Sequence, residues 1–235
     1  MDVFVYCHAK RLAPDLPIPV LEKIIEQTNP GMAMNVARNL EAVGLEVQLT
    51  TNENWRENSK TRFVDRKSNH SFFRLDYGEP IQALVTIPDL SPYDAVVIAD
   101  YDKGFLSEDL IGQILSLHPR CFLDTKKVLG SWASNAYLIK INDYEYGRSE
   151  SYIKSDTKIQ RKIVRTMGGE GAEFDGVKYP ALKVDVLDSS GAGDAFMAAL
   201  VAGVLRSDSI PEAIAFANLQ ASEVVKHRGV TTIHD

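Results

Sequence analysis

The sequence is short of cysteine and of positive charge, and each shortage excludes a class of protein. Its 235 residues include only two cysteines, Cys7 and Cys121, which are too few for a disulfide framework. Both lie in apolar runs, so we interpret them as buried free thiols in a reducing compartment. The net charge of −6, from 26 basic and 32 acidic residues, argues against a nucleic-acid partner, because nucleic-acid binders usually carry a basic excess.

Long apolar runs are also lacking. The longest one, residues 195–205, is too short to span a bilayer, and no basic segment precedes an apolar one at the start, as in a signal peptide. We therefore expect a cytoplasmic protein with no membrane partner. The chain is still 45% hydrophobic, and its 235 residues are enough for one domain with a large core.

Strands and helices alternate along the chain, which predicts an α/β protein. Continuous apolar runs such as residues 94–100 are typical of strands buried on both faces of a parallel sheet, where ligands bind at the carboxyl ends. A polar linker over 51–60 and a hairpin over 61–76 interrupt this pattern. The expected strands cover residues 3–7, 45–49, 94–100, 121–123, 137–141 and 163–166, and the expected helices residues 31–43, 107–117, 193–205 and 211–226.

The stretch DSSGAGDAF, residues 188–196, indicates an anion site. Gly191, Ala192 and Gly193 carry no bulky side chains, and the helix that follows presents unpaired N–H donors and a partial positive charge. Asp194 would repel a bound phosphate, unless it takes a proton from a hydroxyl while the N–H groups stabilise a transferring phosphoryl group. The alternative is a plain glycine turn with Asp194 as an ordinary acid in the first helical turn.

This stretch resembles the DxxGAGD signature of the ribokinase, or PfkB, family of sugar kinases, and three further motifs occur in the family's order. They are PGMAMNVA at 30–37, which resembles GGAANVA, NDYE at 142–145, which resembles NxxE, and TMGGEG at 166–171, which resembles TxGxxG. Within the family the chain is most similar to the D-glycero-D-manno-heptose 7-phosphate kinases, the kinase half of bifunctional ADP-heptose synthesis enzymes. Residues 11–20, 60–76, 99–106 and 122–127 carry that likeness.

The resemblance implies a ribokinase-like three-layer α/β sandwich with a mostly parallel sheet, shortened relative to the family. Residues 1–235 would form one kinase domain, with segments 3–20 and 61–76 as a small β lid. Lids of this family often pair between subunits, so a homodimer through the lid is expected by analogy. The cofactors implied are ATP and Mg²⁺, and the partner is a sugar or sugar phosphate.

The resemblance also assigns roles at the nucleotide end. Asp194 would deprotonate the sugar hydroxyl, and Gly191, Ala192 and Gly193 would form the anion hole for the γ-phosphate. Asn142 and Glu145 would organise Mg²⁺ through water, although NxxE is also a common helix cap. The nucleotide would contact Lys126, Thr166, Gly168, Gly171, Asp188 and Asn218. A tight turn at the glycines, a loop acid at Asp188, a surface lysine and a solvated helix asparagine are the alternatives.

At the sugar end, the resemblance implies Asp2, Gly31 and Asn35 as contacts to the sugar. Asp2 could equally be a disordered terminal residue. A sugar phosphate also needs Lys or Arg contacts. The candidates are Lys60, Arg62, Arg66, Arg74 and Lys103, any one of which could simply face water.

Several departures from the family pattern fall at the sugar end. The family opens with a strand ending in Gly-Asp, which would precede Asp2 and is not found here. A strand–helix unit that the family has after Thr51 is replaced by the polar linker. Met32 stands where the second glycine of GGAAN is expected and could reshape the sugar site, Lys127 replaces the glycine of DPKG, and Asp102 inserts an acid into DYxKG. Two functions follow from this pattern: a compact kinase with a changed substrate, or a degenerate homologue that binds nucleotide or sugar phosphate without turnover. A start upstream of Met1 is a further alternative.

Overall fold

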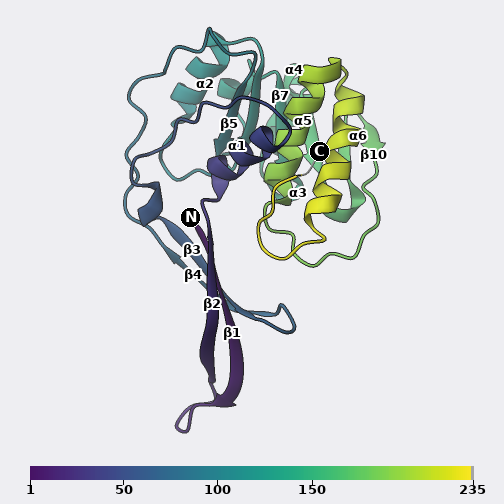
Figure 1. The fold of residues 1–235 in the computed structure, drawn as a ribbon. Coiled ribbons are helices and arrows are strands. Elements are labelled where there is room, and N and C mark those ends of the chain that lie inside the picture. The colour runs from purple at the N-terminus through teal and green to yellow at the C-terminus, as the bar shows by residue number, and fades with distance from the viewer. Residues whose placement is uncertain (234–235) are drawn as a thin grey trace. The chain divides into compact units, whose positions relative to one another are not determined.

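A computed structural model describes residues 1–233 of the chain, apart from the side chain of Met32, so the expectation for Met32 lies outside what it describes. The chain divides into two compact units, drawn in Figure 1. Unit 1 consists of Met1–Gly31 and Glu53–Pro80, and unit 2 of Met32–Asn52 and the chain from Ile81 onward. Both segments expected for the lid, 3–20 and 61–76, fall in unit 1. Within residues 1–233, no helix has both the length and the apolar character needed to cross a bilayer.

Unit 1 is built on a four-stranded sheet in the order β2-β1-β3-β4. The strands are β1 (Asp2–Leu12), β2 (Pro19–Asn29), β3 (Ser59–Asp65) and β4 (Ser71–Tyr77). β3 and β4 form the hairpin expected over 61–76, and Asn69 turns it at φ 61°. β3 begins at Ser59, within the expected linker. β2 has no counterpart among the predicted strands, because most of its side chains are exposed and it lacks apolar alternation.

Unit 2 holds a six-stranded sheet in the order β10-β9-β8-β7-β6-β5. Its strands are β5 (Val96–Asp100), β6 (Cys121–Thr125), β7 (Leu138–Asn142), β8 (Ile163–Thr166), β9 (Ala172–Phe174) and β10 (Val177–Tyr179). β5 to β8 are parallel, and β9 and β10 are antiparallel. The helices are α1 (Met32–Ala42), α2 (Glu108–Leu117), α3 (Asp143–Ser155), α4 (Thr157–Gln160), α5 (Ala192–Ser207) and α6 (Ile210–Val224). The expected helices and buried strands are therefore confirmed, with one exception.

Two apolar layers make unit 2 the expected three-layer sandwich. On one face of the sheet Phe122, Leu138 and Val164 pack against α1, α5 and α6, and α5 and α6 lie side by side in Figure 1. On the other face the intervening residues of the same strands pack against α2, α3 and α4. Alternate residues of β6 and β7 thus enter opposite layers, as strands covered on both faces require.

The expected strand at residues 45–49 is wrong. Leu45, Val47 and Leu49 are half-buried and their neighbours exposed, as the alternation predicts, but the segment is irregular. Alternation reports one-sided burial, whereas a strand also needs a hydrogen-bonded neighbour. In the described part of the chain β5 is an edge strand of the six-stranded sheet and pairs with β6 alone, so residues 45–49 do not pair with it. Both cysteines are buried as expected, and burial raises the pKa of the Cys121 thiol to about 11.

The packing of α5 on α6 generates a stability prediction. A Cβ atom on Gly203 would lie 2.7 Å from Ala213 Cα, so Gly203→Ala should force the helices apart and lower the free energy of unfolding by about 1–3 kcal/mol. Gly147, in α3, has open space around it, and Gly147→Ala should leave stability unchanged or raise it by up to about 1 kcal/mol. Urea denaturation measures both variants. Equal effects would show that the close helix contact does not explain Gly203.

Candidate active site

The carboxylate of Asp194 lies at the start of α5 in unit 2 and is only 8% exposed. Two donors from different elements hold it. Asn35 Nδ2, from α1, donates to Oδ2 at 2.7 Å, and the Tyr101 hydroxyl, from the loop after β5, donates to Oδ1 at 2.5 Å. Each carboxylate oxygen thus has one donor and keeps capacity for a second. Asn35, expected at the sugar, is therefore a direct partner of the expected base.

Burial raises the pKa of Asp194 above that of an ordinary aspartate, because it penalises the charged form. The hydrogen bonds from Asn35 and Tyr101 oppose this rise, the charge of Asp124 adds to it, and Lys140 opposes it. A more basic carboxylate is a better proton acceptor near neutral pH.

The glycine turn before Asp194 is closely packed. Gly191 is the N-cap of α5 at φ 82°, and a Cβ there would lie 3.0 Å from both Asn35 Nδ2 and Val230 Cγ1. No side chain caps this end of α5. The Ala192 amide donates to the Ser189 carbonyl at 3.3 Å and the Ala195 amide to the Gly191 carbonyl at 2.9 Å, so the amides of Gly193 and Asp194 are the ones directed to an anion. The expected anion hole at Gly191, Ala192 and Gly193 thus has a suitable backbone.

A buried ion pair lies beneath this turn. Lys140 Nζ, from β7, contacts Asp124 Oδ2, from β6, at 2.6 Å, and both side chains are almost fully buried. A Cβ on Gly193 would lie 3.1 Å from Lys140 Nζ, so this ammonium group reaches the turn. Burial alone would lower the pKa of Lys140, but the charges of Asp124, Asp194 and Glu145 outweigh it and raise the pKa. The turn therefore rests on a permanent positive charge.

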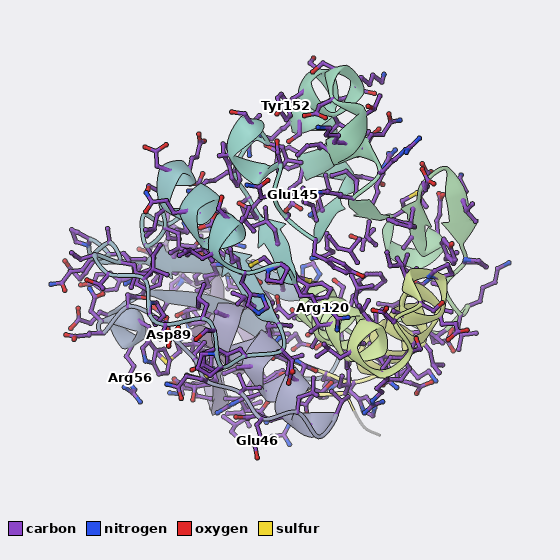
Figure 2. The ribbon with its side chains drawn as sticks, turned by 90° about the horizontal axis from the view of Figure 1, so that it is seen from above. Glu46, Arg56, Asp89, Arg120, Glu145 and Tyr152 are labelled. Carbon is purple, nitrogen blue, oxygen red and sulfur yellow. The ribbon has the colours of Figure 1, made fainter. Side chains whose placement is uncertain are left out.

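Asn142 and Glu145 form a complete capping box at the start of α3, which is the helix-cap alternative for the NxxE motif. The Glu145 amide donates to Asn142 Oδ1 at 3.0 Å, and the Asn142 amide to Glu145 Oε2 at 2.8 Å. Glu145 is 3% exposed, and its Oε1 also accepts from Lys126 Nζ. Figure 2 labels Glu145 together with Tyr152, which lies on the same helix. Lys126, expected at the ATP phosphate, is thus held by Glu145.

These residues fit Mg²⁺ only in the indirect way that was expected. Within residues 1–233, no three Asp, Glu, His or Cys side chains come together as a metal site. Magnesium commonly retains several waters and takes other ligands from substrate phosphates, so one carboxylate and one amide can orient it through water. Within residues 1–233, the protein side chains alone do not provide a complete set of ligands for Mg²⁺.

The loop after β5 is braced by two residues that depart from the family pattern. Lys127 Nζ contacts Asp102 Oδ1 and lies 3.6 Å from Asp100 Oδ2, and the Lys127 side chain is only 9% exposed. Asp100 also accepts from Thr125 Oγ1 at 2.7 Å and from the Asp102 amide at 3.1 Å. Asp102 lies at φ 52°, in the left-handed region. The inserted acid and the lysine that replaces a glycine therefore compensate each other.

The residues expected at the nucleotide have clear structural roles. Thr166 ends β8, and its Oγ1 donates to the Ile141 carbonyl at 3.4 Å. Gly168 and Gly171 lie at φ 56° and 97°, and a Cβ on Gly171 would collide with the Tyr179 carbonyl. Glycine is therefore required at 171 for the fold alone, and nucleotide contact there stays a prediction.

Asn218 and Asp188 organise the segments around the last helix. Asn218 is 5% exposed and Nδ2 donates to the Tyr179 carbonyl at 2.8 Å, so the solvated asparagine alternative is wrong. Asp188 accepts from the amides of Ser190 at 2.9 Å and Gly229 at 3.0 Å, which fixes the turn before α5. The segment just before Asp188 lines an open hollow of about 580 Å³ together with Lys226. Its lining residues are Lys183, Val184, Asp185, Leu187 and Lys226.

Six of the residues expected at the sugar end belong to unit 1, namely Arg66, Arg74 and four that lie close together, Asp2, Gly31, Lys60 and Arg62. Asp2 begins β1, so it is not a disordered terminus, and its Oδ1 accepts from Arg62 Nη1 at 2.9 Å. Lys60 is the register partner of Asp2 on β3, and Gly31, at φ 68°, approaches the Asp2 carboxylate so closely that a Cβ would collide with it. One corner of this sheet therefore collects the four residues. Lys103 belongs to unit 2, where it is exposed.

Sequence reasoning missed Tyr101, Asp124 and Lys140 as parts of the site. Tyr101 and Asp124 lie in stretches that carried the heptose-kinase likeness, yet they received no role. The signal for Lys140 was plain, because a lysine in a strand buried on both faces needs a carboxylate partner. The partner itself comes from another strand, and sequence spacing does not reveal it.

Comparisons with known proteins show the family and the fold of this chain. A family model described as "pfkB family carbohydrate kinase" matches residues 117–235. The "Bifunctional protein HldE" of a Nitratiruptor species is 27% identical over 281 residues, covering 99% of this chain and 61% of that relative. Ribokinase from Thermotoga maritima aligns with a TM-score of 0.71 at 15% identity, covering 97% of this chain and 91% of that one. Arabidopsis thaliana ribokinase complexed with ribose and ATP aligns with a TM-score of 0.67 at 13% identity, covering 97% and 90%.

Removing one member of the buried pair of Lys140 and Asp124 should lower stability strongly, whereas replacing both members should lower it little. Lys140→Met leaves a buried carboxylate without a partner and should lower the free energy of unfolding by about 3–5 kcal/mol. Adding Asp124→Asn should restore most of the loss, as a double-mutant cycle by urea denaturation would measure. Lys154→Met removes the exposed pair with Glu150 and should change little. Additive losses at 124 and 140 would contradict a coupled pair.

Proposed function

Because this chain belongs to the pfkB family of carbohydrate kinases, we propose that it transfers the γ-phosphoryl group of ATP to a hydroxyl of a sugar or sugar phosphate. The observation that carries the proposal is the buried Asp194 carboxylate, at the uncapped start of α5 and directly after a glycine turn. A proton acceptor and an anion site are thereby adjacent, and phosphoryl transfer needs little else from a protein.

In this proposal Asp194 accepts the proton of the sugar hydroxyl as its oxygen attacks the γ-phosphorus, and the bond to the ADP oxygen breaks. Asn35 and Tyr101 keep the carboxylate in one orientation, and each of its oxygens can still accept the incoming proton. The amides of the first turn of α5 stabilise the charge on the transferring group, and Lys140 supports them from below.

The nucleotide end follows the family's pattern in this proposal. The amides around Gly168 and Gly171 and the region of Asp188 and Asn218 would line ATP. Bound Mg²⁺ would neutralise charge on the phosphates, with Asn142 and Glu145 orienting its waters. Lys126 lies on Glu145 and has a flexible side chain that is 35% exposed, so it can move to a phosphate. The complex of Arabidopsis ribokinase with ribose and ATP supports the choice of nucleotide.

For the acceptor, we propose a heptose 7-phosphate as the first candidate. The support comes from the likeness to relatives named bifunctional HldE, of which this chain spans 61% of the length. In unit 1, Asp2 and Gly31 stay the predicted contacts to the sugar, and Lys60 and Arg62 the predicted contacts to its phosphate. In unit 2, Lys103 stays a predicted phosphate contact. Pairing of two copies through the β lid stays a prediction, and the exposed apolar side chains of Phe73 and Leu75 on β4 favour it.

Asp194→Asn tests the base. Turnover should fall by about 10²- to 10⁴-fold, whereas ADP affinity should stay near the wild-type value. Stability should rise at neutral pH. The native pKa of Asp194 is raised, so the native state holds the Asp194 proton up to a higher pH than the unfolded state does. The free energy of unfolding therefore falls as pH rises from the unfolded pKa through the native pKa, and an asparagine avoids that loss. Turnover, ADP titration and urea denaturation measure the three effects. Unchanged turnover would rule out Asp194 as the base.

A substrate panel tests the reaction itself. We expect ATP consumption with Mg²⁺ to be stimulated by D-glycero-D-manno-heptose 7-phosphate more than by free heptose, ribose or fructose 6-phosphate, because Lys60 and Arg62 offer charge for a phosphate. A coupled ADP assay on the purified chain measures this, with Asp194→Asn as the control for contaminating kinases. Retained ADP binding with no stimulation across the panel would favour the non-catalytic alternative.

A further inference from the structure

Tyr101 makes the shortest contact to the proposed base, and no family motif assigns it a role. Its hydroxyl lies 2.5 Å from Asp194 Oδ1, although 93 residues separate the two along the chain. An ionised carboxylate can accept hydrogen bonds but not donate them, so Tyr101 must be the donor when Asp194 is in the form that acts as a base. Tyr101 therefore does not compete with Asp194 for the role of proton acceptor.

The backbone on both sides of Tyr101 is fixed. Asp100 precedes it and is held by Thr125 Oγ1 and by the Lys127 ammonium group, and the Asp100 carbonyl accepts from the Lys126 amide at 3.0 Å. Asp102 follows it, held by Lys127 and by the turn through Asp100. A tyrosine in a loop braced at both neighbours presents its hydroxyl in a defined direction, which a mobile loop would not do.

The ring of Tyr101 also meets the nucleotide end of the site. Lys126 Nζ lies 5.5 Å from the ring centroid, within the range of a cation–π contact, and the same ammonium group pairs with Glu145. One side chain thus touches both the proposed base and the lysine expected at the phosphate.

We propose that Tyr101 is a positioning residue, which fixes the rotamer of Asp194 through Oδ1 while Asn35 fixes it through Oδ2. This inference rests on the proposed function, in which Asp194 is the base. Two donors from separate elements, α1 and the loop after β5, determine the plane of the carboxylate, and neither donor alone would do so. The hydroxyl also stabilises the ionised form of Asp194 against the cost of burial, and so keeps a buried acid available as a base.

Loss of the Tyr101 hydroxyl therefore has a defined sign. The pKa of Asp194, already raised by burial, rises further when a donor to the carboxylate is removed. The other groups that face Asp194 are unchanged by such a variant. They are Asn35 from α1, Asp124 from β6 and Lys140 from β7. The carboxylate then becomes ionised only at higher pH, and the acidic limb of the turnover profile moves in the same direction.

The experiment compares Tyr101→Phe with the wild-type chain. Aspartate carboxyls are labelled with ¹³C, the Asp194 signal is identified by its loss in Asp194→Asn, and its titration is followed in ligand-free protein. We expect the midpoint to move up by about one to two pH units in Tyr101→Phe. The acidic limb of turnover with ATP and D-glycero-D-manno-heptose 7-phosphate should move by the same amount. An unchanged Asp194 midpoint overturns the inference.

Tyr152→Phe is the matched control. Tyr152 is half-buried on α3, its hydroxyl donates weakly to Asp156 at 3.5 Å, and its removal should leave the Asp194 midpoint in place. An equal shift in this control would mean that Tyr101 acts only through general stability. If Tyr101→Phe does not fold, the wild-type chain with ¹³Cζ-labelled tyrosine gives the answer. The Tyr101 signal must then follow the Asp194 midpoint, and its failure to do so overturns the inference.

The titration separates this inference from the proposed function, because it needs no turnover. A chain without kinase activity but with a shifted Asp194 midpoint would refute the proposed function and keep the Tyr101 contact. An active chain that depends on Asp194 but shows no shift would refute the role of Tyr101 alone.

Discussion

The second unit depends on the balance of charge around the Asp194 carboxylate. Within residues 1–233, four acidic side chains are buried, Asp100, Asp124, Glu145 and Asp194, and charged groups are almost never buried without partners. Lysines balance Asp100, Asp124 and Glu145, whereas the hydrogen-bond donors of Asp194 are neutral, an amide and a phenol. Asp194 is therefore the one of these four carboxylates that no lysine pairs with directly, and burial raises its pKa.

This arrangement also connects the fold to the chemistry. Parallel strands end at the same edge of a sheet, so Asp100, Thr125 and Asn142, the last residues of β5, β6 and β7, lie along one edge. The α5 helix, almost completely buried, brings its uncapped end to the same place. The pairs of Lys127 with Asp100 and Asp102 join the loops after β5 and β6, so the backbone around Tyr101 is oriented before a ligand binds. Preorganised dipoles of this kind stabilise charge without reorganisation.

The sequence predicted the parallel strands, the helices α1, α2, α5 and α6, and the hairpin over 61–76, because each has a periodicity or a turn signal of its own, whereas α3 and α4 were not predicted. It also pointed to Asp194, the glycine turn and the NxxE pair as candidates, since these lie in short contiguous motifs, and their catalytic roles stay predictions. It failed at residues 45–49 and at β2, where strand formation depends on a neighbour and not on a local pattern. It also failed at Tyr101, Asp124 and Lys140, whose roles come from contacts between strands that no spacing along the chain reveals.

The Asp102–Lys127 pair couples the loop after β5 to the loop after β6. With Lys127 present and no acid at 102, the ammonium group would still have Asp100 at 3.6 Å. With Asp102 present and no lysine at 127, buried Asp100 would lose its cation, whereas Asp102, whose side chain is 48% exposed, would keep water as a partner. Lys127 is therefore the member of the pair on which the buried charge of Asp100 depends, and the two loops do not vary independently at these positions.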